Sequence, residues 1–305
     1  MYKGTLRMSL QQTLVNKYCQ LCGMEACRPM YRLNGFEVLR CPGCHLTFLS
    51  FHPTLHELQE MYGPSYFEER RSYFFEHAVV DPLSGSQNGS GHAFRDILHL
   101  LSRFAGPGRL LDVGCATGVF LALVRDAGWE PYGVDISAYA AMHARERLAL
   151  TNIVEGTLVE ARFPDGFFDA ITLLDVFEHL PEPLVELQEI RRVLKQGGLL
   201  IINTPNEESL LRRIARLLYL SSFGQFTYPV ERLYHPYHLC SYSPACLQRV
   251  LEDSGFTITS TDKKPMLGPK GRASPFVRRL LKALSGVETL LGMEYELLVV
   301  AHKGS

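Results

Sequence analysis

The sequence predicts an α/β protein with a doubly wound sheet, preceded by a small cysteine-containing module. From residue 109 onward, short apolar runs that fit strands alternate with segments of helical period, which is the pattern of a parallel sheet covered by helices. Before this region, four of the eight cysteines fall into two close pairs. At 305 residues, the chain has room for one large domain or two modest ones.

The two cysteine pairs have the spacing of a metal site. Cys19 and Cys22 enclose two residues, as do Cys41 and Cys44, and 18 residues separate the pairs. This pattern is typical of a tetrahedral zinc site with four thiolate ligands. The alternative is a redox or disulfide pair. His45 follows the second pair directly and could replace Cys44 as a ligand.

The segment between the pairs indicates a zinc ribbon. Residues 31–40 are expected to form a hairpin that turns at Asn34 and Gly35, because Asn-Gly is a strong signal for a two-residue turn. A ribbon over residues 15–50 is too short to bury a sufficient core, so the expected zinc is structural. Ribbons also bind nucleic acid, but this segment holds few basic residues.

A second motif predicts a nucleotide cofactor site. The apolar strand 109–113 contains Asp112 and runs into a turn where Gly114, Ala116 and Gly118 let the backbone approach a ligand closely. This spacing differs from the G-x-G-x-x-G pattern that binds the pyrophosphate of a dinucleotide. The site is therefore expected to take a different cofactor.

The next acidic residue narrows the choice of cofactor. The expected strand 131–135 ends at Asp135, about 20 residues after Gly114. A carboxylate in this place can hydrogen-bond both hydroxyls of a ribose. It favours an adenosine whose 2′-hydroxyl is free.

Together, these motifs resemble motif I and the following acidic loop of class I S-adenosylmethionine (SAM)-dependent methyltransferases. Residues 168–181 resemble the fourth strand and its loop in the ubiquinone-biosynthesis-like methyltransferases, and residues 193–202 resemble their turn into strand five. The resemblance covers residues 93–305 and implies a Rossmann-like sheet with an antiparallel last strand. We expect strands near 109–113, 131–135, 152–154, 168–174, 199–204, 256–262 and 295–302.

The resemblance also implies a set of cofactor-binding residues. The turn from Gly114 to Gly118 would line the methionine part of SAM, Asp135 would bind the ribose, and Ile136 would lie beside the adenine. The expected set is Asp112, Gly114, Cys115, Ala116, Thr117, Gly118, Asp135, Ile136, Gly156, Thr157 and Asp175. Where related enzymes often carry an acid near the adenine amine, this chain has Gly156 and Thr157, so recognition there would rest on backbone groups or on Glu160.

The expected reaction is an in-line displacement, in which the acceptor attacks the methyl carbon of SAM. Alignment then supplies most of the catalysis, and a base is needed only when the acceptor carries a proton of high pKa. His179 is the first candidate base, because histidine accepts a proton near neutral pH. Asp175 is expected to orient cofactor or substrate. His238 is the second candidate or a structural residue, and with His235 it could hold a second metal, although no further ligand pair is evident.

Two other regions bear on the acceptor. Residues 51–92 are expected to form an aromatic helical segment and a linker, with a Gly/Ser-rich hinge at 81–91. The aromatic residues would either cover the cofactor or pack on the catalytic domain. Basic amphipathic helices are expected at 208–220 and 275–291. They would form a lid or a dimer surface, or would rest on an anionic membrane and admit a lipid-linked acceptor.

We therefore expect a SAM-dependent methyltransferase that acts on oxygen or nitrogen, with carbon as a further option, of a small metabolite, glycan or lipid precursor. The alternatives are an RNA methyltransferase that binds its substrate through the ribbon, and a non-catalytic SAM-binding or zinc-ribbon interaction protein. The net charge of −1 gives no general reason to expect nucleic acid as a partner. No leader or membrane-spanning run is evident, so a cytoplasmic location is expected, and the oligomeric state is left open.

Overall fold

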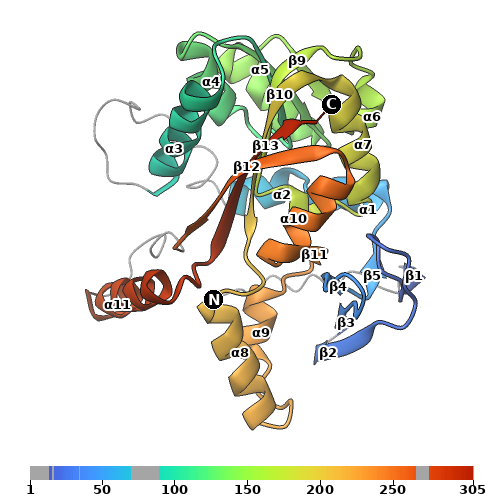
Figure 1. Ribbon diagram of the computed structural model, residues 1–305, viewed down its shortest axis with the longest axis vertical. Coiled ribbons are helices and arrows are strands. Elements are labelled where there is room, and N and C mark those ends of the chain that lie inside the picture. Colours follow the sequence, from blue (N-terminus) through green and yellow to red (C-terminus); the bar gives the residue numbers. More distant parts are fainter. Residues whose placement is uncertain (1–13, 16, 34, 70–88, 266–274, 305) are drawn as a thin grey trace.

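The computed structural model contains a seven-stranded sheet flanked by helices (Figure 1). It describes residues 14–15, 17–33, 35–69, 89–265 and 275–304, so most of the expected hinge at 81–91 lies outside the described residues. In order across the sheet, the strands are β12 (Phe256–Lys264), β13 (Glu296–Lys303), β10 (Leu194–Pro205), β9 (Phe168–Leu174), β6 (Arg109–Val113), β7 (Glu130–Asp135) and β8 (Ile153–Glu155).

The pairing of these strands confirms the predicted doubly wound sheet. β6 is parallel to both β7 and β9, β7 is parallel to β8, and β9 is parallel to β10. β13 lies antiparallel between β10 and β12, so the last strand has the expected direction. The carboxyl ends of the parallel strands thus meet at one edge, which is where ligands bind in such sheets.

One strand begins earlier than expected. The Gly197-Gly198 pair indicates a turn in the sequence, but β10 already starts at Leu194. The pairing with β9 shifts register between Leu194 and Leu199, and Gly197 has φ +71° within that irregularity. The glycines therefore form a bulge inside one strand rather than a turn before it.

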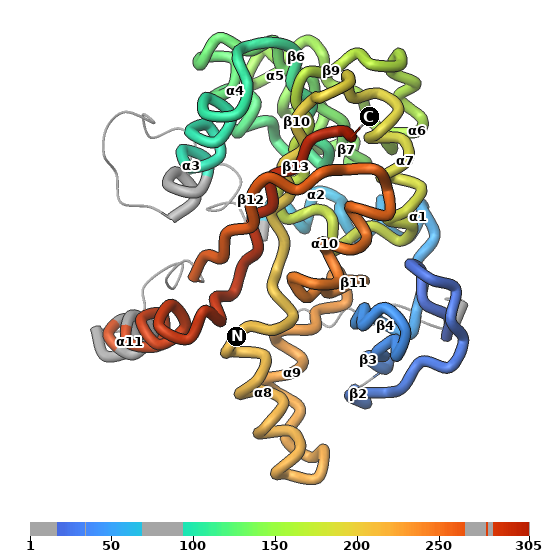
Figure 2. Tube along the Cα trace, in the orientation of Figure 1, coloured from blue at the N-terminus to red at the C-terminus, as the bar shows by residue number. Residues whose placement is uncertain are grey.

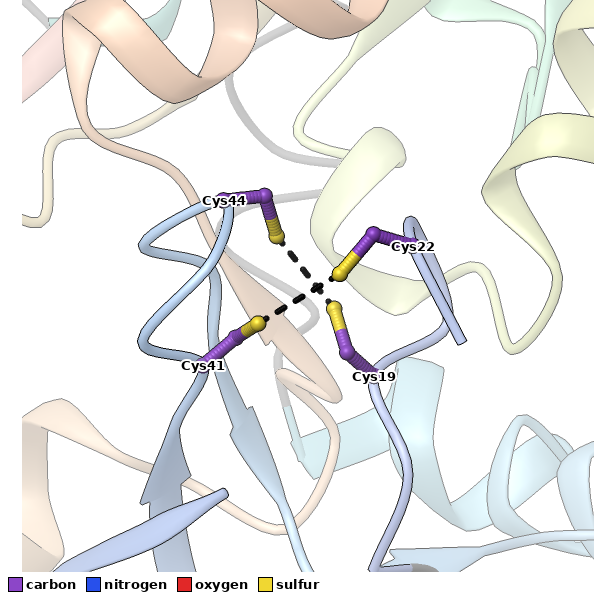
Figure 3. Close-up of side chains that lie close together, drawn as sticks. All are labelled: Cys19, Cys22, Cys41 and Cys44. Atoms are coloured by element: carbon purple, nitrogen blue, oxygen red, sulfur yellow. Dashed lines mark hydrogen bonds between the residues drawn. The ribbon is translucent and has the colours of Figure 1, made fainter. Parts of the chain in front are cut away.

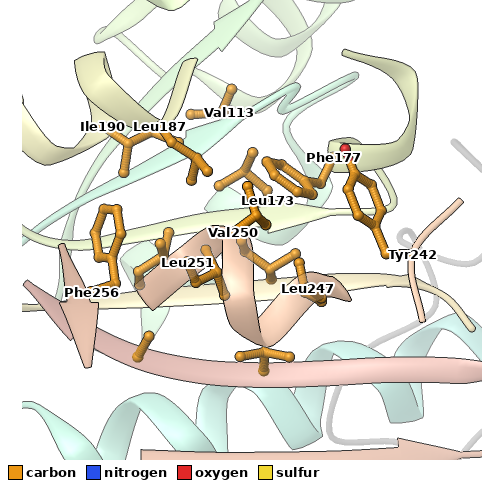
Figure 4. Close-up of a cluster of buried hydrophobic side chains, with 14 of the residues drawn as sticks. Val113, Leu173, Phe177, Leu187, Ile190, Tyr242, Leu247, Val250, Leu251 and Phe256 are labelled. Carbon is orange, nitrogen blue, oxygen red and sulfur yellow. The ribbon is translucent and has the colours of Figure 1, made fainter. Parts of the chain in front are cut away.

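Helices cover both faces of the sheet. α3 (Gly89–Phe104), α4 (Val119–Asp126) and α5 (Ala138–Leu148) supply side chains to the core on one face. On the other face lie α6 (Leu158–Ala161), α7 (Pro183–Val193) and α10 (Pro244–Asp253). Figure 4 shows part of this second core, in which side chains of α7 and α10 meet those of the sheet.

Helix α3 begins inside the segment that was expected to be a hinge. It starts at Gly89, so the prediction of a loop up to residue 91 was wrong at its end. The apolar residues Ile97, Leu100 and Leu101 recur at helical spacing and are buried, which stabilises the helix through tertiary packing. That packing outweighs the low helix propensity of the glycines in its first turn.

The N-terminal ribbon forms a sheet that includes β11, a strand from the second half of the chain. Its strands are β2 (Arg28–Leu33), β3 (Phe36–Arg40), β4 (Thr47–Leu49) and β11 (Cys240–Ser241), while β1 (Leu14–Val15) pairs with β5 (Phe51–His52). β2 and β3 pair up to Leu33 and Phe36, as expected for a hairpin with two residues in its turn. β4 pairs antiparallel with β11, and Leu49 N–H donates to the Leu239 carbonyl at 2.9 Å. The ribbon is thereby joined to the large sheet domain.

The remaining helices lie near the carboxyl edge or project from the body. α1 (Leu55–Met61), α2 (Pro64–Glu69) and the 3₁₀ turn η2 (Phe177–His179) lie near that edge. α8 (Leu210–Ser221) and α9 (Tyr228–Leu233) form a hairpin that extends away from the sheet, and α11 (Pro275–Leu291) extends from the body in another direction, to the left of the view (Figure 1, Figure 2). Among the described residues, no helix is both long and apolar enough to cross a membrane.

Candidate functional site

The turn after β6 needs glycine at two positions. Gly114 has φ +70°, and a Cβ atom added there would lie 2.5 Å from Val176 Cγ2. Gly118 has φ +79°, and an added Cβ would lie 2.6 Å from Leu150 Cδ1. Both conformations are unfavourable for residues with side chains, and both sites leave no room for one. The backbone between them is therefore held in a compact loop at the carboxyl edge.

The carboxylate of Asp135 fixes this loop from the end of β7. Its Oδ2 accepts a hydrogen bond from Ala116 N–H at 2.8 Å, and its Oδ1 accepts one from Ser137 N–H at 2.8 Å. Burial raises the pKa of Asp135 to about 6, although the two backbone donors act in the opposite direction. Because each carboxylate oxygen has a second lone pair, the side chain can also accept hydroxyl donors of a ribose.

Asp112 and Cys115 are buried next to the turn after β6. Asp112 is 4% exposed, and its Oδ1 accepts a hydrogen bond from Thr172 Oγ1 at 2.6 Å between β6 and β9. Burial raises the pKa of Asp112 to about 7. Cys115 lies in the core, and burial raises the pKa of its thiol, so it packs as a neutral side chain. Asp112 can support the site from within the sheet.

The loop after β8 is organised as a helix start. Thr157 is the N-cap of α6, and its backbone N–H donates to Glu160 Oε2 at 2.8 Å in a capping box. The carboxylate of Glu160 therefore accepts a hydrogen bond from the backbone at the start of its own helix. To recognise the adenine as well, it would have to keep this hydrogen bond and accept a second one from the adenine amine. Gly156, at φ +129°, leads into this cap. Ile136 is partly buried and packs against the same cluster as Tyr62 and Tyr66.

Tyr62 connects Ser137, which follows β7, to His179. Its carbonyl accepts a hydrogen bond from Ser137 Oγ at 2.7 Å, and its hydroxyl lies 2.9 Å from His179 Nδ1. His179 Nδ1 is also 2.5 Å from the Tyr237 carbonyl, which can only accept, so Nδ1 carries a proton. The neutral ring then has its lone pair on Nε2. Asp135, Ser137, Tyr62 and His179 thus form one connected chain.

Two further side chains lie next to His179. Glu178 is buried, accepts a hydrogen bond from Thr204 Oγ1 at 2.9 Å, and has a carboxyl oxygen 3.9 Å from His179 Nε2. Burial and the charge of Asp175 raise the pKa of Glu178 to about 8. The ring of His238 packs edge-on against His179 with centroids 4.8 Å apart. Burial lowers the pKa of His238 well below its usual value, so this ring is neutral.

This group differs from the metal site considered in the sequence. The ring of His235 stacks on that of Tyr237. Ligand atoms of Glu178, His179 and His238 lie within 4.8 Å of one another, so these three residues could hold a cation. The group also has the composition of an acid–base site, with one carboxyl and two imidazoles.

Asp175 occupies a strained position at the end of β9. Its φ of +55° is uncommon for a residue with a side chain, and such strain is frequent at functional sites. Its backbone N–H donates to the Asn203 carbonyl at 3.0 Å, and its Oδ1 accepts from Asn203 Nδ2 at 2.8 Å. This pairing ties the exposed Asp175 to the end of β10.

The four cysteines of the two pairs converge in space. Figure 3 shows their thiols pointing toward one another, and the ligand atoms of Cys19, Cys22, Cys41 and Cys44 all lie within 4.8 Å of one another. The sulfurs of Cys19 and Cys44 are 3.3 Å apart, and those of Cys22 and Cys41 are 3.5 Å apart. Zinc–sulfur bonds of about 2.3 Å in a tetrahedron place sulfurs about 3.8 Å apart, so the donor set fits zinc.

A buried ion pair that the sequence analysis missed ties the ribbon to the large domain. Arg212 donates to Glu207 Oε2 at 2.6 Å, and both side chains are almost fully buried. The other oxygen of Glu207 accepts from Thr47 Oγ1 of the ribbon at 3.2 Å and from Tyr234 Oη at 2.7 Å. Arg212 also donates to Ser241 Oγ at 3.1 Å. The only sequence signal was an arginine on an amphipathic helix, which alone suggests a solvated face.

Comparison with known proteins agrees with this geometry. Residues 90–261, more than half of the chain, match a family described as a methyltransferase domain. A "Probable S-adenosylmethionine-dependent methyltransferase" of Mycolicibacterium smegmatis is 29% identical over 50% of this chain and 53% of that protein. A ubiquinone biosynthesis O-methyltransferase of Pectobacterium carotovorum is 24% identical over 53% of this chain and 71% of that protein. The chain thus spans about half the length of the mycobacterial relative.

Solved structures show the same fold. A SAM-dependent methyltransferase from Archaeoglobus fulgidus aligns with a TM-score of 0.52 and 20% identity, over 78% of this chain and all of that one. The [4+2]-cyclase SpnF aligns with a TM-score of 0.54 and 20% identity, over 83% of this chain and 97% of that one. Because one of these neighbours is named as a cyclase, the fold by itself does not fix the reaction. The family match, the sheet and the glycine turn together place the chain in the class I SAM-dependent methyltransferase family.

Proposed function

We propose that the protein transfers a methyl group from SAM to an oxygen or nitrogen of a small metabolite, glycan or lipid precursor, with His179 as the general base. Carbon is the remaining option for the acceptor atom. The observation that carries this proposal is the hydrogen-bonded chain from Asp135 through Ser137 and Tyr62 to His179. It links a side chain suited to hold ribose with one suited to take a proton.

The cofactor would be held by the glycine turn and by Asp135. Bound SAM supplies an electrophilic methyl group on a positively charged sulfonium. The compact backbone between Gly114 and Gly118 allows close approach, and the ionised carboxylate of Asp135 accepts hydroxyl donors. The aromatic residues Tyr62 and Tyr66 pack together beside Ile136, where they exclude water from the edge.

His179 is positioned to take the acceptor proton on Nε2. Its Nδ1–H is held by the Tyr237 carbonyl, which fixes both the ring orientation and the tautomer. An acceptor hydroxyl or amine within hydrogen-bond reach of Nε2 would lose its proton to the ring during attack. His238, kept neutral by burial, packs against His179 and would hold the ring in place.

We also propose that the four cysteines bind a structural zinc ion. The support is the convergence of the four thiols and the small size of the ribbon, which buries little apolar surface without the large domain. Through the β4–β11 pairing, the ribbon contacts a strand that begins two residues after His238. Its proposed role is to hold this acceptor-side loop against the catalytic edge.

The base assignment is tested with His179→Gln in the full-length protein. Single-turnover formation of S-adenosylhomocysteine would be followed with a panel of phenol, alcohol and amine acceptors. We expect the rate to fall by about 10²–10⁴-fold while the affinity for S-adenosylhomocysteine stays unchanged. The matched control is His235→Gln, which removes a ring stacked on Tyr237. An unchanged rate in the His179 variant contradicts its role as base.

A further inference from the structure

The hairpin of α8 and α9 has apolar side chains on its outer surface. Exposed fractions are 67% for Leu217, 55% for Leu220 and 94% for Phe223. Further exposed apolar or aromatic residues on the same hairpin are Ile214, Leu218, Phe226 and Tyr228. A cluster of this kind is unusual on a soluble surface and marks a contact with another apolar phase.

Helix α8 carries an apolar stripe on its outer side. Its inward positions are Arg212, which forms the buried ion pair with Glu207, the small Ala215, and Tyr219, whose ring packs on Tyr31. Ile214, Leu217 and Leu218 follow the i, i+3, i+4 spacing of one helical stripe, and all three are exposed. The inward side of α8 thus combines one buried ion pair with the packed residues Ala215 and Tyr219, while the apolar stripe faces outward.

The tip of the hairpin is uncharged and strained. From Leu217 to Val230, the chain contains no Asp, Glu, Lys, Arg or His. Phe223 lies in the turn between the helices with φ +52°, a conformation that is unfavourable for an aromatic residue. The strained turn places the most exposed phenylalanine ring of the hairpin at its end, and Figures 1 and 2 show that the hairpin projects from the body.

Basic side chains border the apolar stripe. Arg213 and Arg216 are exposed on α8, one helical turn before Leu217 and Leu220 respectively. No acidic residue occurs within α8, and the acids that flank the uncharged segment are Glu208 and Glu231, near the base of the hairpin. An apolar tip with cations behind it matches a bilayer whose headgroups are anionic.

We propose that the α8–α9 hairpin docks on an anionic lipid bilayer, with Leu217, Leu220 and Phe223 inserted among the acyl chains and Arg213 and Arg216 at the phosphates. The hairpin projects from the body, so it can reach a bilayer ahead of the rest of the protein (Figure 1). A second copy of the chain would bring the same arginines face to face across a symmetric contact, which opposes that occupant. This inference does not depend on the identity of the methyl acceptor.

The test is flotation of the full-length protein with vesicles, without any methyl acceptor. Vesicles of phosphatidylcholine with phosphatidylglycerol are compared with vesicles of phosphatidylcholine alone. The variant Leu217→Asp/Phe223→Asp is expected to lower the partition coefficient by at least about tenfold. The variant Arg213→Gln/Arg216→Gln is expected to remove the preference for the anionic vesicles. Val185→Asp, at an exposed apolar position on α7, is the matched control and should bind like wild type.

Several results would overturn the proposal. If wild-type protein floats with neither type of vesicle, the hairpin does not bind membranes. The same conclusion follows if the Leu217→Asp/Phe223→Asp variant floats like wild type. An equal loss in Val185→Asp shows that the binding is not specific to the hairpin. Light scattering after size exclusion supplies the second readout. A wild-type dimer that the aspartate double variant converts to monomer identifies a second copy as the occupant instead.

Discussion

The affinity for SAM is expected to fall as the pH drops below about 6, because Asp135 must be ionised to accept the ribose hydroxyls. The pKa of Asp135 in the folded protein is raised to about 6, so its protonated form becomes the major species below that pH. One pH unit lower, about one molecule in eleven remains ionised, and the apparent affinity is reduced roughly tenfold. Above about pH 7, the affinity should be independent of pH on this account.

The variant Asp135→Asn should remove both the charge and the pH dependence. Its amide presents N–H groups toward one of the two backbone donors, from Ala116 or Ser137, that the carboxylate accepts in the wild type. The loss of charge-assisted hydrogen bonds is expected to weaken cofactor binding by about 1–3 kcal/mol at pH 7. The control is Asp112→Asn, because Asp112 is also buried, with a pKa of about 7, but is bonded within the sheet to Thr172.

The assay is calorimetric titration with S-adenosylhomocysteine between about pH 5 and pH 8, since this product retains the ribose. In Asp112→Asn, the affinity for S-adenosylhomocysteine should still change with an inflection near pH 6. In Asp135→Asn, the affinity should be lower and should not depend on pH. If Asp135→Asn binds as tightly as wild type, Asp135 does not hold the ribose. If the inflection persists in Asp135→Asn but disappears in Asp112→Asn, the titrating group has been misassigned.

Three other substitutions probe the turn, the buried ion pair and the ribbon. Gly114→Ala should lower both the melting temperature and the cofactor affinity, because the added methyl group meets a side chain at a positive φ; unchanged values for both would show that the turn is adaptable. Arg212→Met should reduce the free energy of unfolding in urea by about 3–5 kcal/mol, since it leaves Glu207 buried without its partner. In contrast, Arg249→Met breaks an exposed pair and should cost less than about 1 kcal/mol; equal losses would refute this reasoning. Cys41→Ser should abolish the bound zinc measured by metal analysis and make the ribbon sensitive to protease, while the cofactor still binds; a zinc-free ribbon that stays resistant would exclude a structural metal.

Most strands of the large sheet could be predicted from the local pattern of apolar residues in the sequence. Strands such as 109–113 and 168–174 match the prediction because each is a short apolar run whose neighbours in the chain are its covering helices. The start of β10 at Leu194 was missed, since a Gly-Gly pair favours a turn and a bulge equally well in sequence. The start of α3 was missed because packing of its later turns overrode weak local propensity.

The candidate site was predictable only in part. Asp135 and the glycine turn were found because they are adjacent to strands whose carboxyl ends must meet. Glu178 is next to His179 in the sequence, but its burial and raised pKa depend on Thr204 and on the packing of the edge. The role of Glu160 as a capping residue was available from the Thr-x-x-Glu pattern at 157–160 and was not used.

The sequence by itself determined the features whose partners lie close together in the chain or follow a fixed spacing. These are the two cysteine knuckles, the glycine turn, the carboxylate that follows the second sheet strand and the alternation of strands and helices. Only the tertiary structure decided that Tyr62 meets His179 across 117 residues and that Thr47 meets Glu207 across 160 residues. It also decided that β4 pairs with β11 and that α8 faces outward with its apolar side. Such contacts depend on how the whole chain packs, and no local periodicity encodes which distant partners a buried polar group will find.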